Sequence, residues 1–222
     1  MTEFAPHLSS WFPLLAPEHQ ERVRQDIKVH QYPPGAMIVR KGESSDHWIG
    51  VIEGLIRISV GNADGKVAAL IGIPSGGWVG EGSLLKKEQR KYDIIALRHS
   101  TIAKMPAYTF EWLLDNSIPF NRYLLHLLNE RVGHFVGKAE HDRLLNADAR
   151  IARCLAELCN SRLYPGIGNR MEITQEELGY LARVSRQRAN QALKKLEADG
   201  LLSVEYGAIC VEDLEGLQNY GN

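Results

Sequence analysis

The pattern of apolar and polar residues divides the chain into three parts. From about residue 28 to residue 106, short runs rich in Val, Ile and Leu alternate with turn signals such as Pro33-Pro34-Gly35 and Gly76-Gly77. The runs recur at about the 8–12 residue spacing expected of a small antiparallel sandwich or barrel. We therefore predict an antiparallel β-roll, or jelly roll, preceded by a short helix that begins at Pro17.

A helical pattern follows the β-roll. No proline occurs in residues 120–164, and the run from Phe120 to Leu145 favours one long helix. Its apolar residues form two series at helical spacing. These are Leu124, Leu128, Phe135 and Leu145, and Leu125, Val132, Val136 and Ala139. A helix that is apolar on two faces must bury both. We expect one face to cover the β-roll and the other to meet a second copy of the chain; burial within a single chain is the alternative.

The C-terminal part, from about residue 148, predicts three helices and a hairpin around Tyr206-Gly207. The T-x-x-E pattern that starts at Thr174 is a capping box, which begins a helix. Ser185 caps the next helix, and Gly200 ends it at the position where glycine adopts a left-handed conformation most easily. Two short helices joined by a tight turn and followed by a hairpin form a winged helix-turn-helix.

The sequence therefore predicts an α+β protein with three parts. The first, residues 1–115, is the β-roll, which we expect to act as a sensor domain. The second, residues 116–147, is a dimerisation helix and hinge. The third, residues 148–222, is the winged helix-turn-helix domain.

Composition changes this picture only in part. The 222 residues carry a formal net charge of −1, with a pI near 6.7. A wholly basic surface is excluded, but a local basic patch is not. No apolar run approaches the roughly 20 residues of a membrane span, and no secretory signal is visible, so we expect a cytoplasmic protein without a membrane partner.

The helix after Ser185 carries the candidate chemistry for binding DNA. From Arg186 through Lys195 it contains no acidic residue. Arginine can bond guanine O6 and N7 together, and glutamine can bond adenine N6 and N7, as a reader of the major groove requires. Lysine adds positive charge for phosphates. A solvated helix face in a helical bundle is the structural alternative. The candidates on this helix are Arg186, Gln187, Arg188, Gln191 and Lys194.

The arrangement of β-roll, long helix and winged helix-turn-helix resembles the CRP/FNR superfamily of bacterial transcription regulators. The resemblance covers nearly the whole chain. Its most specific stretches are GEGSLL, residues 80–85, and ITQEELGYLARVSRQRANQALKKLEADGLL, residues 173–202. It implies a homodimer that binds a palindromic operator in double-stranded DNA and contacts RNA polymerase. It also implies a β-roll that senses a small-molecule effector or a cofactor.

The match to the family is uneven in the reading helix. Arg186 matches the base-reading arginine of the family. The next position is often Glu but is Gln187 here, and Gln191 stands where cyclic-AMP-dependent members have a second arginine. Because Glu accepts from cytosine N4 and Gln prefers adenine, we expect a two-fold symmetric site with a different half-site. The full set of DNA-binding candidates is Thr174, Gln175, Ser185, Arg186, Gln187, Arg188, Gln191 and Lys194, the first two by their match to phosphate-contacting positions.

The resemblance also implies a cyclic-nucleotide pocket, whose pattern is incomplete here. The family holds the ribose with a Gly-Glu pair, the phosphate with an Arg-Ser pair and the base with a polar pair on the dimer helix. Gly80-Glu81 are present, and Arg90 aligns with the phosphate arginine. Lys91 and Tyr92 follow it in place of small residues, and Phe135-Val136 replace the polar pair. Because a site built on hydrogen bonds discriminates steeply when they are missing, we do not expect cyclic AMP as effector. A purely structural turn at Gly80-Glu81 is the alternative.

Other cofactors find little support in the sequence. The oxygen-sensing branch of the family binds an iron–sulfur cluster through cysteines near the N-terminus, but none precedes Cys154 here, so we do not expect this cluster. We interpret Cys154 and Cys159 as core residues, with a redox role as the alternative. His99 is the least unsuitable haem ligand and is expected at the surface. Trp48 and Trp78 are expected in the core rather than in a ligand cage. We predict no metal site.

Two other classes of function compete with DNA binding. A sensor module whose winged domain contacts protein instead of DNA is the first alternative. An enzyme is the second, but the sequence has no HExxH, GxSxG or P-loop motif, so we do not expect one.

Overall fold

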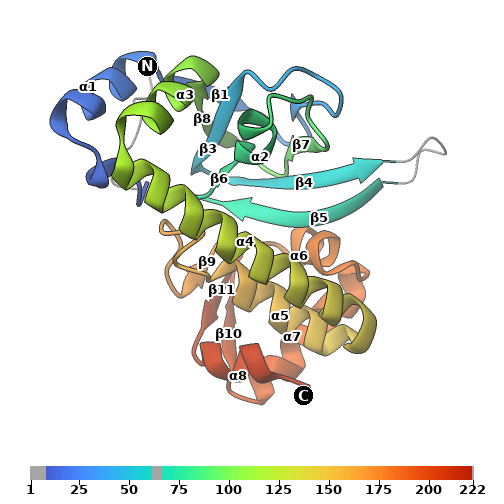
Figure 1. Ribbon diagram of the computed structural model, residues 1–222. Helices are drawn as coiled ribbons and strands as arrows, with labels where there is room; N and C mark the ends of the chain where they lie inside the picture. The colour runs from blue at the N-terminus through green and yellow to red at the C-terminus, as the bar shows by residue number, and fades with distance from the viewer. Residues whose placement is uncertain (1–8, 62–66, 222) are drawn as a thin grey trace. The chain divides into compact units, whose positions relative to one another are not determined.

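The computed structural model describes residues 9–61 and 67–221 (Figure 1). The chain forms two compact units. The first consists of Met1–Asn129 with Arg162–Gly166, and the second of Glu130–Ser161 with Ile167–Asn222. The division falls inside one long helix, α4 (Ile118–Leu144), which therefore contributes to both units.

The first unit is built on two antiparallel four-stranded sheets, which confirms the predicted β-roll. The strand order is β1-β8-β3-β6 in one sheet and β2-β7-β4-β5 in the other. The strands are β1 (Lys28–Tyr32), β2 (Met37–Val39), β3 (His47–Glu53), β4 (Leu55–Gly61), β5 (Val67–Pro74), β6 (Trp78–Val79), β7 (Asp93–Ala96) and β8 (Ser100–Pro106). The described helices before α4 are the 3-10 helix η2 (Phe12–Leu14), α1 (Pro17–Asp26), α2 (Glu81–Leu85) and α3 (Ala107–Asn116). Helix α1 begins at Pro17, as predicted.

An aromatic cluster lies in the core of the first unit. The ring centroids of Trp48 and Trp78 are 4.5 Å apart, and both side chains are buried. The other members are Trp11, Phe110 and Phe120. The indole N–H of Trp48 donates to Glu81 Oε2 at 3.3 Å, and that of Trp78 donates to Ser9 Oγ at 3.0 Å. A buried indole needs a partner for its N–H, and both tryptophans have one. Both are therefore core residues, as predicted.

Helix α4 confirms the predicted long helix, and its apolar residues differ in burial. Leu124 and Leu127 are buried in the first unit. Apart from Ile118 at the first position of the helix, four large apolar residues of α4 are exposed, between 43% for Phe135 and 68% for Leu125. We call this set the α4 stripe; its members are Leu125, Val132, Phe135 and Val136. Leu124 and Phe135, which the sequence places in one apolar series, therefore differ in burial within the single chain. No helix in the described part of the chain is long and apolar enough to cross a membrane.

The second unit has the predicted order of helices followed by a hairpin (Figure 1). Its elements after α4 are α5 (Ala147–Leu158), β9 (Arg170–Met171), α6 (Gln175–Ala182), α7 (Arg186–Ala198), β10 (Leu202–Glu205), β11 (Ala208–Val211) and α8 (Leu214–Asn219). Strands β10, β11 and β9 form a small antiparallel sheet in that order. Helices α6 and α7 with this hairpin make a winged helix-turn-helix, as predicted. The short α8, capped by Asp213, was not expected from the sequence.

Candidate nucleic-acid interface

A complete capping box fixes the start of α6. The Thr174 hydroxyl accepts a hydrogen bond from Glu177 N at 3.2 Å, and Glu177 Oε2 accepts one from Thr174 N at 2.7 Å. These two bonds satisfy amide groups that a helix terminus otherwise leaves unpaired. The predicted capping box is confirmed, and it places Gln175 at the first position of the helix.

The turn between the helices is as tight as predicted. Arg183 ends α6 in a left-handed conformation, with φ of 55°, and Val184 N donates to Gly179 O at 2.9 Å. A Cβ at Gly179 would lie 2.9 Å from Val184 O, so glycine permits this close return of the chain. Ser185 Oγ then accepts from Arg188 N at 3.1 Å and begins α7. Gly200, with φ of 76°, follows the end of α7.

The buried side of α7 consists of small and apolar residues. Its members are Ala189, Ala192, Leu193 and Leu196, each no more than 1% exposed. Four of the candidates on the helix are exposed; these are Arg186, Gln187, Gln191 and Lys194. The structure therefore brings together one Arg, two Gln and one Lys on the outer surface of α7, as expected from the sequence.

Arg188 differs from these four residues. Its Nη2 lies 2.6 Å from Asp148 Oδ1, in the first turn of α5. About a third of its side chain, 37%, is exposed. Arg188 is therefore only partly exposed, because its guanidinium is engaged by a carboxylate of a neighbouring helix.

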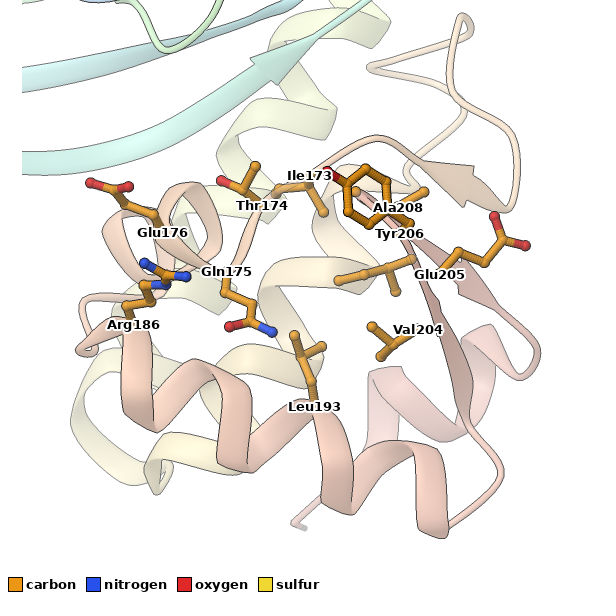
Figure 2. A pocket seen from close by; sticks show the side chains of 12 residues that line it. Ile173, Thr174, Gln175, Glu176, Arg186, Leu193, Val204, Glu205, Tyr206 and Ala208 are labelled. Carbon is orange, nitrogen blue, oxygen red and sulfur yellow. The ribbon is translucent and has the colours of Figure 1, made fainter.

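A cleft separates α7 from the wing (Figure 2). It has a volume of about 690 Å³ and is lined by residues at the start of α6, by Arg186 and Leu193 of α7 and by β10 and β11. Arg186, Gln175 and Tyr206 surround it in Figure 2. Gln175 Nε2 donates to Asn190 Oδ1 at 3.2 Å and so connects α6 to α7. Asn190 is not among the predicted DNA-binding residues, although its polar amide, one turn after Arg186, is a signal for it in the sequence.

The wing presents an aromatic side chain at its tip. Tyr206 is fully exposed and precedes Gly207, whose φ of 73° allows the tight turn between β10 and β11. Next to the tip, Glu205 at the end of β10 pairs through Oε2 with Arg170 Nε of β9 at 3.0 Å. This contact raises the pKa of Arg170 and lowers that of Glu205. Neither Tyr206 nor this pair was selected from the sequence as a functional group.

In the β-roll, three of the candidate effector residues come together. Gly80 has φ of 103° and precedes α2, where Glu81 is 4% exposed. Arg90 is 3% exposed and donates from Nη1 to Gly80 O at 3.2 Å and from Nη2 to His47 O. A Cβ at Gly80 would collide with Arg90 Nη1, so the guanidinium packs directly on the glycine backbone. Burial lowers the pKa of Arg90, which its neighbouring acidic groups partly offset.

The other two effector candidates have different surroundings. Lys91 is exposed and pairs through Nζ with Glu88 Oε2 at 3.1 Å. Phe135 belongs to the α4 stripe and falls in the second unit, whereas Gly80 and Arg90 fall in the first.

The cysteines and histidines give no sign of a cofactor site in the described part of the chain. No group of three or more His, Cys, Asp or Glu side chains is placed there to hold a metal ion. Cys154 is buried, as predicted, and Cys159 is half-buried with its Sγ 3.8 Å from Met171 Sδ. Burial raises the pKa of the Cys159 thiol to about 11, which disfavours its reactive thiolate. His99 is exposed, as expected.

Comparison with known sequences identifies both parts of the chain. The cyclic nucleotide-binding domain matches residues 29–117, and the Crp-like helix-turn-helix domain matches residues 149–220. The cAMP-activated global transcriptional regulator CRP of Pasteurella multocida is 26% identical over 187 residues, 82% of this chain and 89% of that protein. The HTH-type transcriptional regulator Cmr of Mycobacterium tuberculosis is 28% identical over 208 residues, 91% of this chain and 81% of that protein.

Solved structures agree with the sequence comparison. FixK2 from Bradyrhizobium japonicum has the same fold, with a TM-score of 0.68 at 18% identity over 87% of this chain and 96% of that one. The c-di-GMP responsive global regulator CLP of Xanthomonas campestris has a TM-score of 0.61 at 25% identity over 88% and 99% of the two chains. Regulators of this family bind DNA and function as dimers. With a cyclic-nucleotide-binding-like β-roll followed by a Crp-like winged helix-turn-helix, the chain belongs to the CRP/FNR family of DNA-binding transcription regulators.

Proposed function

We propose that this regulator reads a palindromic operator as a homodimer, with α7 of each copy in the major groove of one half-site. The outward group of Arg186, Gln187 and Gln191 on α7 carries this proposal. All three side chains are exposed, and the helix behind them is held by buried Ala and Leu residues. A rigid helix with such side chains near its N-terminus suits a groove about 12 Å wide.

Each candidate takes a role that its chemistry supports. Arg186 bonds guanine O6 and N7, and Gln187 and Gln191 bond adenine. Lys194 neutralises a phosphate. The residues at the helix starts, Thr174, Gln175 and Ser185, contact the DNA backbone, where helix N-termini favour an anion.

The long helix supplies the dimer contact. The α4 stripe exposes four apolar residues on one side of a helix, and packing against the same stripe of a second copy would remove them from water. The three functional parts are then the β-roll sensor in residues 1–115, the dimerisation helix and hinge in residues 116–147, and the DNA-binding domain in residues 148–222. RNA polymerase is the further partner, and operator position decides between activation and repression.

We expect any effector of the β-roll to be a small molecule other than cyclic AMP. The names of several relatives include cAMP activation. In this chain both terminal nitrogens of Arg90 donate to backbone carbonyls, and Lys91 pairs with Glu88. A phosphate would have to replace these contacts, and Phe135 offers the nucleobase no side-chain hydrogen bond. The residues present therefore do not fit a cyclic nucleotide.

Titration calorimetry with cyclic AMP tests this part of the proposal. We expect no binding at micromolar nucleotide and no change in operator affinity. Arg90→Gln is the informative variant. If Arg90 is structural, this change lowers the free energy of unfolding by about 1–3 kcal/mol without ligand, because buried hydrogen bonds are lost. One molecule of cyclic AMP bound per chain, with tighter operator binding, would contradict the proposal.

Selection from a random duplex pool tests the function itself. The purified protein, with no ligand added, should recover a palindrome whose half-sites lie about one helical turn apart. Recovery of no sequence preference, with or without cyclic nucleotides, would favour the alternative of a sensor module that acts through protein contacts.

A further inference from the structure

One carboxylate holds two cations of α7. Asp148 lies in the first turn of α5, and only 12% of its side chain is exposed. Its Oδ1 is 2.6 Å from Arg188 Nη2, and its Oδ2 is 3.6 Å from Lys195 Nζ. A carboxylate this buried is stabilised by paired cations, and loss of the pairing would leave an uncompensated charge.

The backbone that carries this carboxylate is itself fixed. Asn146 caps α5, and its Oδ1 accepts hydrogen bonds from Asp148 N at 3.0 Å and from Ala149 N at 3.1 Å. Helix α5 packs against α7. The Asp148 side chain therefore leaves a rigid helix start, where an acidic residue also interacts favourably with the helix dipole.

The geometry of α7 separates this contact from the reading surface. At about 100° per residue, Arg188 and Lys195 fall within about 20° of each other around the helix axis. Gln187 and Gln191 lie on the outward side of the helix, away from the buried Ala and Leu residues. Arg186 lies at the opposite edge of the buried side from Arg188 and Lys195, about 20° around the axis from Leu193. The two cations thus lie along one edge of the helix, between its buried and its outward sides.

A second contact extends this edge towards the end of the chain. Lys195 Nζ lies 5.8 Å from the Tyr220 ring centroid, and Tyr220 Oη donates to Asp199 Oδ2 at 2.8 Å. Tyr220 and, next, Asp148 raise the pKa of Lys195, so the lysine stays charged.

We propose that Asp148 is a positioning residue for the reading helix. By holding Arg188 and Lys195 together, it fixes the rotation of α7 about its own axis, and so decides which way Arg186, Gln187 and Gln191 point. Arg188 then acts through α7 and does not read a base. This inference rests on the proposed role of α7 in reading DNA.

Three variants test the proposal on the full-length protein: Asp148→Asn, Arg188→Gln and the double variant. Binding is measured to the selected operator and to a scrambled duplex of equal length, each at several salt concentrations. We expect each single variant to weaken operator binding about tenfold, with scrambled binding changed less than twofold. The double variant should lose no more than about the same factor, because both changes remove one interaction.

The salt dependence separates positioning from direct contact. A positioning role leaves the slope of log K against log salt unchanged. If Arg188 instead contacts a phosphate, Arg188→Gln lowers the magnitude of that slope by about one, and Asp148→Asn tightens binding to both duplexes. Either result would overturn the proposal, as would unchanged operator binding by both single variants.

Two controls make the outcome specific. Glu215→Gln removes one negative charge from an exposed position of the same unit, and shows what loss of charge alone does to DNA binding. Thermal melting shows that each variant is folded; Arg188→Gln, at a partly exposed position, carries the test if Asp148→Asn does not fold. A wild-type protein without sequence preference would overturn the proposed function and this inference together, whereas loss of preference only in the variants supports both.

Discussion

Arg186 and Arg188 are the same residue type, two positions apart on α7, in opposite surroundings. Arg186 is exposed beside the cleft, whereas Arg188 is tied to Asp148 of α5. Two positions along an α-helix correspond to a rotation of about 200° around its axis, so the two side chains project in nearly opposite directions and meet different surroundings. Only Arg186 keeps its five donors available for a base edge or a phosphate.

At the residue scale, the first prediction concerns Arg186. Arg186→Ala should cost about 1–3 kcal/mol of operator binding and relax the sequence preference at one base position of each half-site. Arg186→Lys is the matched control, since it keeps the charge and loses the planar fork that bonds guanine at two atoms. Selection from the random pool with each variant gives the preference directly. An unchanged preference with Arg186→Ala would show that Arg186 reads no base.

At the element scale, the capping box determines how firmly α6 is held. Thr174→Ala should lower the free energy of unfolding by about 1 kcal/mol, because Glu177 N loses its acceptor at the partly buried start of the helix. Thr174→Ser keeps the hydroxyl and should retain most of the stability. Urea denaturation without DNA measures both variants, so the proposed phosphate contact of Thr174 does not enter. Equal stability of the Ala and Ser variants would contradict the role of the cap.

At the scale of the whole molecule, the α4 stripe determines the oligomeric state. Val132→Asp should weaken dimerisation by about 2–4 kcal/mol, since each dimer would bury two unpaired carboxylates. Sedimentation equilibrium should show monomers at concentrations where the wild type is dimeric, and binding to the two-fold operator should fall with it. His126→Asp introduces the same charge at an exposed position outside the stripe and should leave the dimer intact. Dimers of Val132→Asp as stable as those of the wild type would exclude the stripe as the interface.

Local signals were sufficient for much of the fold. The capping box at Thr174, the Ser185 cap and the glycines at 200 and 207 all lie where the structure has them, because each depends on a few neighbouring residues. Strand alternation and turn spacing likewise predicted the β-roll. The outward position of Gln187 and Gln191 followed from helical periodicity alone.

Contacts between distant segments were not visible in the sequence. Asp148 and Arg188 are far apart in the chain, so nothing local indicated that one would engage the other. The same holds for Arg90, whose terminal nitrogens donate to the carbonyls of Gly80 and His47. Periodicity puts Leu124 and Phe135 in one series, but it does not report how far another element covers each of them, and only Leu124 is buried within the chain.

The sequence by itself therefore determined the elements, their caps, their order and the outward reading group on α7, since these depend on backbone preferences and on the helix and strand periods. Only the tertiary structure decided that Arg188 forms an ion pair with Asp148 and that Arg90 donates to backbone carbonyls. It also decided that the α4 stripe stays exposed within the described chain. The physical reason is that pairing and burial depend on which distant groups the fold brings within a few ångströms, and a single sequence carries no local sign of those partners.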